Sequence, residues 1–366
     1  MHILALVLGC AILSAVLWDS FETLVLPRTP VRKLRLTRLF YRATWGLWIA
    51  RARTLRSDRR REGFLAVYGP ISLIGLLTLW AAGLVVGFAL LQWSERERLL
   101  NVSGTPHFFD DLYMSATTLF TLGLGDVMPK DRGGRLLVVA ETSSSLMLLT
   151  MVFAYLPILY QSFARREVRL TMLDAWAGSP PCATEILRRV AACGDVKYLD
   201  AFFAEWEYWC SDLLESHLSY PSIAYFRSQH SRQSWVSALT AVLDAAALVK
   251  VGIEGVPTWR AHLTFAMARH AAVDLTHVLA EPLPPSEDRL PPHELASLRA
   301  ELERAGLRPN RSRDADAELA ALRKSYEPYV TGLSNRLMMS VPRFRSTSRE
   351  PDNWQTEPAS DGGSHL

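Results

Sequence analysis

Cysteine is scarce in this chain, and its few positions exclude two kinds of architecture. The 366 residues include four cysteines, Cys10, Cys182, Cys193 and Cys210, and no two of them have the spacing of a metal-binding pair. They are also too few and too scattered for the disulfide framework of a small secreted domain. We therefore expect free thiols in a reducing compartment.

An excess of one charge is lacking as well. The formal net charge of +3 is too small to predict a nucleic-acid partner. The second half of the chain has no glycine-rich dinucleotide motif and no β-branched runs. These absences argue against nucleotide-binding domains that are built on β-sheets.

Apolar residues are concentrated in the first 163 positions. Three runs are long enough to cross a bilayer, which takes about 20 residues: Ile3 to Leu26, Phe64 to Trp93, and Leu136 to Phe163. The first run lacks the positively charged start of a signal peptide, although Leu8-Gly9-Cys10 resembles a lipoprotein cleavage site, so we expect a retained span. The pattern predicts a membrane half followed by a water-facing half.

A basic segment, residues 28–63, separates the first two runs. It carries twelve arginines and lysines against Asp58 and Glu62. Short loops rich in these residues stay cytoplasmic, so we expect an inner-membrane protein with its N-terminus outside and its C-terminal domain in the cytoplasm. The spacing of Arg32, Arg35 and Arg38 resembles a voltage sensor, but one preceding span cannot form the supporting bundle. An interfacial helix that binds membrane lipids, with Trp45 and Trp48 at headgroup level, is the better interpretation.

Three acidic residues lie within the apolar runs. Asp19 and Glu22 are three positions apart, and we expect them to pair with nearby arginines rather than to relay ions. Glu141 is the only charge in the third run and needs a partner at membrane depth. We expect that partner to be Thr117 or Thr118.

The segment between the second and third runs carries the chemistry. An amphipathic stretch runs from Phe108 to Phe120. Its end overlaps the start of the sequence Thr117-Thr118-Leu119-Phe120-Thr121-Leu122-Gly123-Leu124-Gly125-Asp126. A ring of backbone carbonyls can replace the water shell of a cation if successive carbonyls point the same way. That conformation needs residues that reach positive φ, and the alternating Gly123 and Gly125 reach it at little cost.

This segment resembles the pore loop of potassium channels, whose pattern is T-x-x-T-x-G-[aromatic]-G-D between two spans. The resemblance implies that the carbonyls of Thr121, Leu122, Gly123 and Leu124 coordinate K⁺ as the permeant ion. It also implies support from the residues around the filter, which are Thr117, Thr118, Gly125 and Asp126. One loop supplies a quarter of the ring, so the implied assembly is a homotetramer that conducts K⁺ passively, without a cofactor and without enzymatic activity.

The segment departs from the family pattern at three places. Leu124 replaces the aromatic residue, Tyr113 and Met114 stand where many members have a tryptophan pair, and Thr117 stands where some have glutamate. Leucine offers less contact area and no hydroxyl donor. Two alternatives therefore stay open: a weakly selective cation channel, and a non-conducting membrane-anchored signalling or scaffold protein.

The third run provides candidates for the inner part of the pathway. Ser144 and Ser145 offer small polar groups in its middle, and Pro157 is expected to kink the helix near its inner end. We predict that these three residues line the pore or form its gate. A kink without any gating role is an equal alternative.

The second half predicts helices at 184–193, 196–217, 231–251, 257–280, 293–305 and 315–337. His270, Asp274 and His277 share one helical face and are weak metal candidates, which would suit a membrane-tethered hydrolase. The stretch 220–230 is either a partner surface or a corner between helices.

The predicted fold is an all-α membrane protein. It has three transmembrane helices, a re-entrant pore helix with its filter, and an all-α cytoplasmic domain with an unknown ligand. The predicted parts are a transmembrane helix 1–27, the basic segment 28–63, a pore domain 64–163, a helical domain 164–342 and a disordered tail 343–366.

Overall fold

The computed structural model describes residues 2–26, 35–94, 99–101, 107–230, 232–279, 288–346 and 351–355. The chain separates into two compact units, Met1–Tyr160 and Gln161–Leu366. Apart from one two-stranded sheet and one isolated bridge, the regular structure of the described residues is helical. The protein is an all-α membrane protein, as the sequence predicts.

The first unit contains the membrane helices. Its elements are α1 (His2–Leu24), α2 (Leu36–Arg53), α3 (Asp58–Ala66), α4 (Tyr68–Trp93), β1 (Leu99–Asn101), α5 (Phe108–Leu119), β2 (Val127–Pro129) and the part of α6 (Arg132–Ala177) up to Tyr160. The segments α1, α3 with α4, and α6 are each long and apolar enough to cross a membrane. They correspond to the three predicted spans, although α6 continues well beyond the predicted end at Phe163.

A fourth helix, α9 (Trp235–Gly252), meets the same criteria of length and composition. However, 83% of its apolar window is buried within the protein. It contacts α7 (Ala183–Ala192), α8 (Tyr198–Ser219), α10 (Trp259–Leu279), α12 (Arg313–Lys324) and α13 (Glu327–Leu337). A helix that is apolar on all sides is either a span or a core helix, and these contacts make α9 the core of the second unit.

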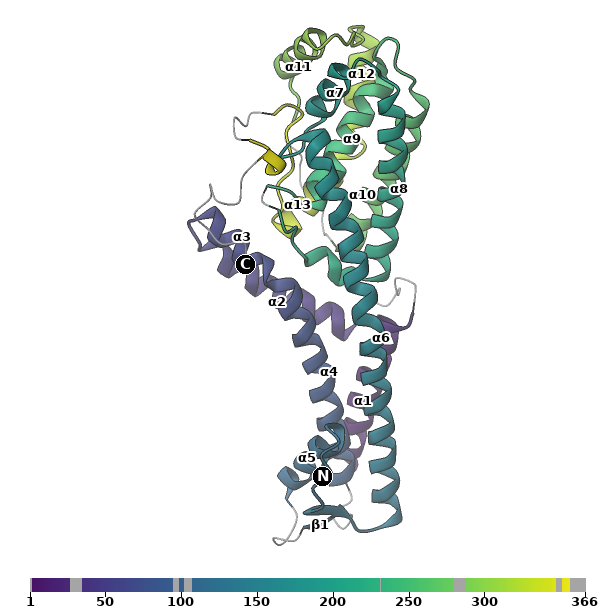
Figure 1. Cartoon of the computed structure of the whole chain (residues 1–366). Coiled ribbons are helices and arrows are strands. Elements are labelled where there is room, and N and C mark those ends of the chain that lie inside the picture. The colour runs from purple at the N-terminus through teal and green to yellow at the C-terminus, as the bar shows by residue number, and fades with distance from the viewer. Residues whose placement is uncertain are drawn as a thin grey trace. The chain divides into compact units, whose positions relative to one another are not determined.

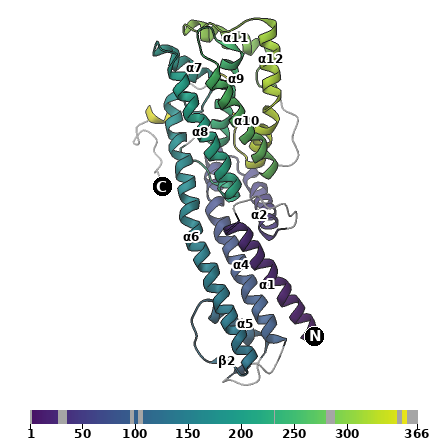
Figure 2. The same ribbon diagram turned by 90° about the vertical axis from the view of Figure 1, so that its right-hand side faces the viewer.

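Glycines set the contact between α1 and α4, which run side by side (Figure 2). A Cβ on Gly83 would lie 2.6 Å from Val16, and one on Gly87 would lie 2.6 Å from Leu13. On the facing helix, a Cβ on Gly9 would lie 2.9 Å from the Gly87 carbonyl oxygen. Gly83 and Gly87 form the G-x-x-x-G pattern that lets membrane helices approach closely, a pattern not among the sequence-based predictions above.

Polar side chains hold α1 and α4 together near the C-terminal end of α1. Asp19 accepts hydrogen bonds from the Trp80 indole at 2.9 Å and from the backbone nitrogen of Thr37 at 3.1 Å. Arg35 forms an ion pair with Glu22 at 3.2 Å. The predicted pairing of the acidic residues with a nearby arginine is therefore confirmed, while Arg28, Arg32 and Lys33 lie outside the described residues.

Aromatic side chains fix α2 and α3 to the start of α4. Trp45 is 1% exposed, and its ring centroid lies 4.6 Å from that of Tyr68. Trp48 stacks on Phe64 at 4.5 Å with an interplanar angle of 13°. The indole ring of Trp45 is thus buried within the chain against Tyr68 instead of facing outward.

The second unit is a bundle in which α8, α9 and α10 pack on one another, with α7, α11 (Pro292–Arg304), α12 and α13 around them (Figure 1). These helices match the predicted stretches closely, with one exception. The predicted helix 315–337 is two helices that meet at Ser325 and Tyr326. Pro328 lies in the first turn of α13, where its missing N–H does no harm.

The prediction of a disordered tail is wrong for residues 343–346 and 351–355, which the structure describes. Phe344 is fully buried, and its carbonyl oxygen accepts a hydrogen bond from the Thr184 hydroxyl at 2.7 Å. Residues 351–355 include a short 3₁₀ helix, η2 (Asn353–Gln355), and Asp352 pairs with Arg189 at 2.5 Å. The remaining residues of that tail, 347–350 and 356–366, lie outside the described part of the chain.

Arg166 of α6 binds the backbone of the segment that follows α8, where a 3₁₀ helix, η1 (Pro221–Tyr225), begins. Its buried guanidinium donates to the carbonyl oxygens of Ile223 at 3.1 Å and Phe226 at 2.8 Å. It also lies 3.3 Å from Nε2 of His217. With Ile223 and Phe226 buried, this part of the stretch 220–230 is a corner between helices.

The buried His217 predicts how the second unit responds to acid. Its Nδ1 lies 2.8 Å from the Leu213 carbonyl oxygen, which only accepts, so Nδ1 carries the hydrogen and Nε2 accepts from Arg166. Burial, followed by the positive charge of Arg166, lowers the pKa of His217 from 6.5 to about 3. The unfolded chain therefore takes up a proton below pH 6.5 that the folded chain takes up only near pH 3.

We expect the free energy of unfolding to fall as the pH drops from 6.5 towards 3, by up to about 1.4 kcal/mol per pH unit from this residue. Denaturant titrations of the purified protein at several pH values measure this slope. His217→Gln should reduce the slope, whereas His293→Gln, at an exposed position, should leave it unchanged. Equal slopes for wild type and His217→Gln would contradict the assignment.

Candidate functional site in the loop after α5

The helix α5 begins with a reciprocal cap. The backbone nitrogen of His107 donates to the Asp110 carboxylate at 2.6 Å, and the backbone nitrogen of Asp110 donates to the His107 carbonyl oxygen at 2.8 Å. Asp110 and Asp111 place acidic side chains in the first turn, where the helix dipole favours them. These contacts explain why the helix starts at Phe108, as the sequence predicts.

The loop after α5 alternates in backbone conformation. Thr121, Gly123 and Gly125 have φ values of +58°, +55° and +79°, while Leu122 and Leu124 between them are not in the positive-φ region. Positive φ is uncommon for a residue with a side chain and marks stored strain at Thr121. Such alternation every second residue is what a row of carbonyls pointing one way requires.

The end of α5 continues into this loop through backbone hydrogen bonds. The amide of Leu122 donates to the Thr117 carbonyl oxygen at 2.8 Å, and that of Thr121 donates to the Thr118 carbonyl oxygen at 3.0 Å. The Thr117 hydroxyl bonds within its own helix, to the Met114 carbonyl oxygen. The two threonines therefore hold the loop through their backbones.

Asp126 connects the far end of the loop to α5. Its carboxylate accepts a hydrogen bond from the backbone nitrogen of Val127 at 3.1 Å. It also lies close enough to Tyr113 of α5 to interact electrostatically with the phenol group. Directly after it, β2 pairs antiparallel with β1, with Val127 opposite Asn101 and Pro129 opposite Leu99. Figure 2 shows β2 close to α5. In the sequence, Tyr113 stands out only as a departure from the family pattern, and this short sheet is not predicted.

Glu141 lies behind α5 but does not bond to the predicted threonines. Its carboxylate accepts hydrogen bonds from the Ser115 hydroxyl of α5 and from the side-chain amide of Gln92 of α4, the latter at 3.3 Å. The prediction of Thr117 or Thr118 as its partner is therefore wrong. Ser115 on α5 and Gln92 on α4 are the residues that contact Glu141 of α6, and both are buried.

The candidates on α6 lie within one continuous helix. Ser144 is partly buried, and its hydroxyl bonds to the Ala140 carbonyl oxygen. Ser145 is buried and bonds to the Glu141 carbonyl oxygen. Pro157 is exposed inside the helix, which continues to Ala177. Their role in a pathway stays a prediction.

The weak metal candidates do not come together. Nε2 of His270 lies 3.1 Å from Asp274, while the ring of His277 packs at 6.2 Å from that of Tyr329. Within the described residues, no group of three histidine, cysteine or acidic side chains could hold a metal ion.

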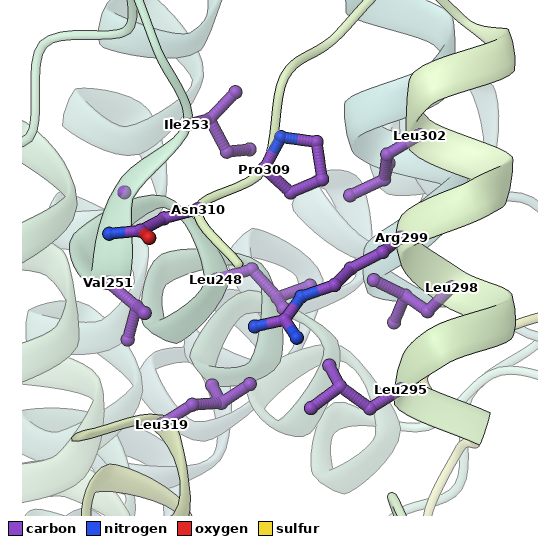
Figure 3. Close-up of a pocket in the computed structure, with 11 residues that line it drawn as sticks. Leu248, Val251, Ile253, Leu295, Leu298, Arg299, Leu302, Pro309, Asn310 and Leu319 are labelled. Carbon is purple, nitrogen blue, oxygen red and sulfur yellow. The ribbon is translucent and has the colours of Figure 1, made fainter. Parts of the chain in front are cut away.

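A small pocket in the second unit is lined mainly by aliphatic side chains from α9, α11 and α12 (Figure 3). The Arg299 guanidinium points into it. That guanidinium is already paired with Asp316, so its charge is satisfied within the protein. This pocket is therefore weaker as a candidate site than the loop.

The family model described as "Ion channel" matches residues 75–162, a stretch that runs from α4 through α5 and the loop into α6. This part of the chain is similar to the ion-channel family. The match covers about a quarter of the chain. The matched stretch thus includes both helices that flank the loop and the loop itself.

One curated protein resembles a longer stretch of the chain. It is described as "Uncharacterized membrane protein YdjJ" from Bacillus subtilis (strain 168) and is 24% identical over 192 residues. The similarity covers 52% of this chain and 55% of that protein, so the chain spans about half of the relative's length. No solved structure matches the chain.

Proposed function

We propose that the protein is a potassium-selective channel formed by four copies of this chain. The observation that carries the proposal is the alternation of positive φ at Thr121, Gly123 and Gly125, within a stretch that is similar to the ion-channel family. Four such loops around one axis would present the carbonyls of Thr121, Leu122, Gly123 and Leu124 to a dehydrated K⁺ ion. The filter would be supported by Gly125, by the backbones of Thr117 and Thr118, and by the Asp126–Tyr113 contact.

We propose a tetramer because each chain contributes one such loop, and one loop supplies a quarter of the ring of carbonyls. In this proposal α5 is the pore helix, and Ser144, Ser145 and Pro157 lie along the inner pathway. Irregular backbone at membrane depth is stable only where it lines such a path or is buried in protein.

The proposed orientation in the inner membrane places the N-terminus outside and residues 161–366 in the cytoplasm. It rests on the basic segment between the first two spans, whose arginines would face the cytoplasmic leaflet. We propose anionic lipids as partners of this segment, because exposed guanidinium groups bind lipid phosphate. Protease access to the second unit only from the cytoplasmic side would support the orientation; access only from outside would contradict it.

A weakly selective cation channel is the second candidate. Leu124 is 65% exposed in the single chain, and leucine cannot donate the hydrogen bond that a tyrosine at this position would offer. The outer end of the loop would then be held chiefly by the Asp126–Val127 hydrogen bond and the pairing of β2 with β1.

Ion uptake into liposomes that contain the purified protein distinguishes the two candidates. We expect K⁺ uptake at least about tenfold above Na⁺ uptake, a difference of about 1.4 kcal/mol in barrier height. Equal uptake that becomes K⁺-selective in Leu124→Tyr would favour the weakly selective channel. Uptake of neither ion, in liposomes made with and without anionic lipid, would contradict both.

A further inference from the structure

Glu141 occupies an unusual place for an acidic residue. It lies on the membrane-spanning helix α6 and is 0% exposed. An acidic group at membrane depth is unfavourable unless polar groups surround it, and such residues usually have a role. Its two hydrogen-bond partners come from two other helices, α5 and α4.

Ser115 is the centre of this contact. Its hydroxyl lies 2.9 Å from the Val85 carbonyl oxygen of α4 and also bonds to Glu141 of α6. The side chain of Ser115 is fully buried, so water does not compete for it. A single residue of α5 is therefore linked to both neighbouring helices.

Gln92 completes the group from the end of α4. Its side-chain nitrogen donates to Glu141 at 3.3 Å, while its buried side-chain oxygen has no hydrogen-bond partner among the described atoms. If an N–H group stood in place of the Glu141 oxygen that Gln92 contacts, the side-chain amide of Gln92 could rotate by half a turn. Its oxygen would then accept a hydrogen bond from that N–H group. Glutamine in place of Glu141 could thus keep both contacts.

The loop is fixed to α5 a short distance beyond this contact. The amides of Thr121 and Leu122 donate to carbonyl oxygens of the last turn of α5, at Thr118 and Thr117. Because a helix turn is stiff, a rotation or a shift of α5 would carry these residues with it. Ser115, one turn earlier, is where such a movement would first break a buried hydrogen bond.

We propose that Glu141 is a positioning residue for the filter loop, acting through Ser115 and Gln92. It holds α5 at a fixed rotation and height against α4 and α6, so that the loop keeps its alternating conformation. This inference rests on the proposed function, because it assigns a residue outside the loop to the selectivity of that loop. A buried hydrogen bond that is broken in apolar surroundings is not replaced by one to water, and its loss would affect all four loops of the proposed filter.

The test compares Glu141→Leu with Glu141→Gln in the K⁺ and Na⁺ uptake assay. Leucine has a similar size but accepts no hydrogen bond, and we expect the ratio of K⁺ to Na⁺ uptake to fall at least tenfold. Glutamine can accept from Ser115 and donate to the free oxygen of Gln92, so we expect a ratio within about twofold of wild type. Rescue by glutamine is a result that a loss of packing would not give.

Thr142→Val is the matched control. Thr142 is the next residue of α6, and its hydroxyl bonds within its own helix, to the Val138 carbonyl oxygen. We expect wild-type uptake for this variant. An assembled Glu141→Leu protein with the wild-type uptake ratio would overturn the proposal, and so would a Glu141→Gln protein as defective as Glu141→Leu.

Ser115→Ala keeps the proposal testable if Glu141→Leu fails to fold. It removes one hydroxyl and should reproduce the loss of selectivity, and the double variant should show no further loss if both residues act together. A wild-type ratio in Ser115→Ala would overturn the proposal.

The wild-type protein reports separately on the channel itself. If it takes up no K⁺, the proposed function fails, and melting temperatures of the same single and double variants then measure whether Ser115 and Glu141 are coupled.

Discussion

Replacing Gly123 by alanine is expected to reduce K⁺ uptake to below about a tenth of wild type. No atom lies within 4 Å of the place where the alanine Cβ would be, so the change creates no clash within the chain. The effect comes from φ, which is +55° at this residue. A side chain in the left-handed region costs about 1–2 kcal/mol per residue, and in the proposed ring four chains would each bear that strain.

Gly46→Ala is the matched control for this prediction. Gly46 also has no atom within 4 Å of the place where a Cβ would lie, but it is inside α2 and has no positive φ. Alanine should stabilise that helix by up to about 1 kcal/mol, and uptake should equal that of wild type. Size-exclusion chromatography checks that both variants assemble. Wild-type uptake by an assembled Gly123→Ala protein would mean that the loop does not conduct in this conformation.

Replacing Asp244 by alanine is expected to lower the free energy of unfolding of the second unit by about 3–5 kcal/mol. Asp244 is 0% exposed in the middle of α9. It accepts from the Tyr326 hydroxyl at 2.5 Å and from the Arg289 guanidinium, which also bonds to the Pro342 carbonyl oxygen at 2.7 Å. Alanine would leave a buried guanidinium and a buried hydroxyl without this partner.

Further contacts extend the same network. Glu327 pairs with Arg323 at 3.0 Å and lies 3.5 Å from Arg289, and the ring of Phe344 lies 5.0 Å from the Arg289 guanidinium carbon. The loss of Asp244 should therefore loosen α13 and the segment around Phe344 together, since they share these groups.

Thermal unfolding of the purified protein measures this effect. At about 2–4 °C per kcal/mol for a unit of this size, Asp244→Ala should lower the melting temperature by roughly 6–20 °C. Asp274→Ala is the control, because its pair with His270 is largely exposed and such pairs contribute about 0–1 kcal/mol. Similar small shifts in both variants would contradict the role of the buried network.

The sequence predicts best what depends on local pattern. Apolar runs and the positions of Gly123 and Gly125 can be read without a structure, because bilayer thickness and backbone sterics set them directly. The helices of the second unit follow from their periodicity, with bounds within a few residues. The break at Tyr326 was missed although Pro328 signals it.

Contacts between distant segments could not be derived in the same way. A carboxylate in a span requires a polar partner, but Ser115, Thr117 and Thr118 are equally able to donate, and only the rotation of α5 selects Ser115. The burial of Phe344 likewise depends on Arg289 and Arg323, whose guanidinium groups both lie close to its ring. The glycine contact of α1 with α4 had a local signal, Gly83 and Gly87, which could have been used.

That glycine contact also determines which helix meets the surrounding lipid. With Leu13 and Val16 seated over Gly87 and Gly83, this face of α4 is closed to acyl chains, whereas Ile3, Leu4 and Val7 of α1 stay exposed. A change in bilayer thickness would then act first on α1, whose hydrophobic length must match the new thickness by tilting. Because the glycines bring α1 and α4 into close contact, the tilt would pass directly to α4, and α1 would act as the part of the protein that responds to membrane thickness.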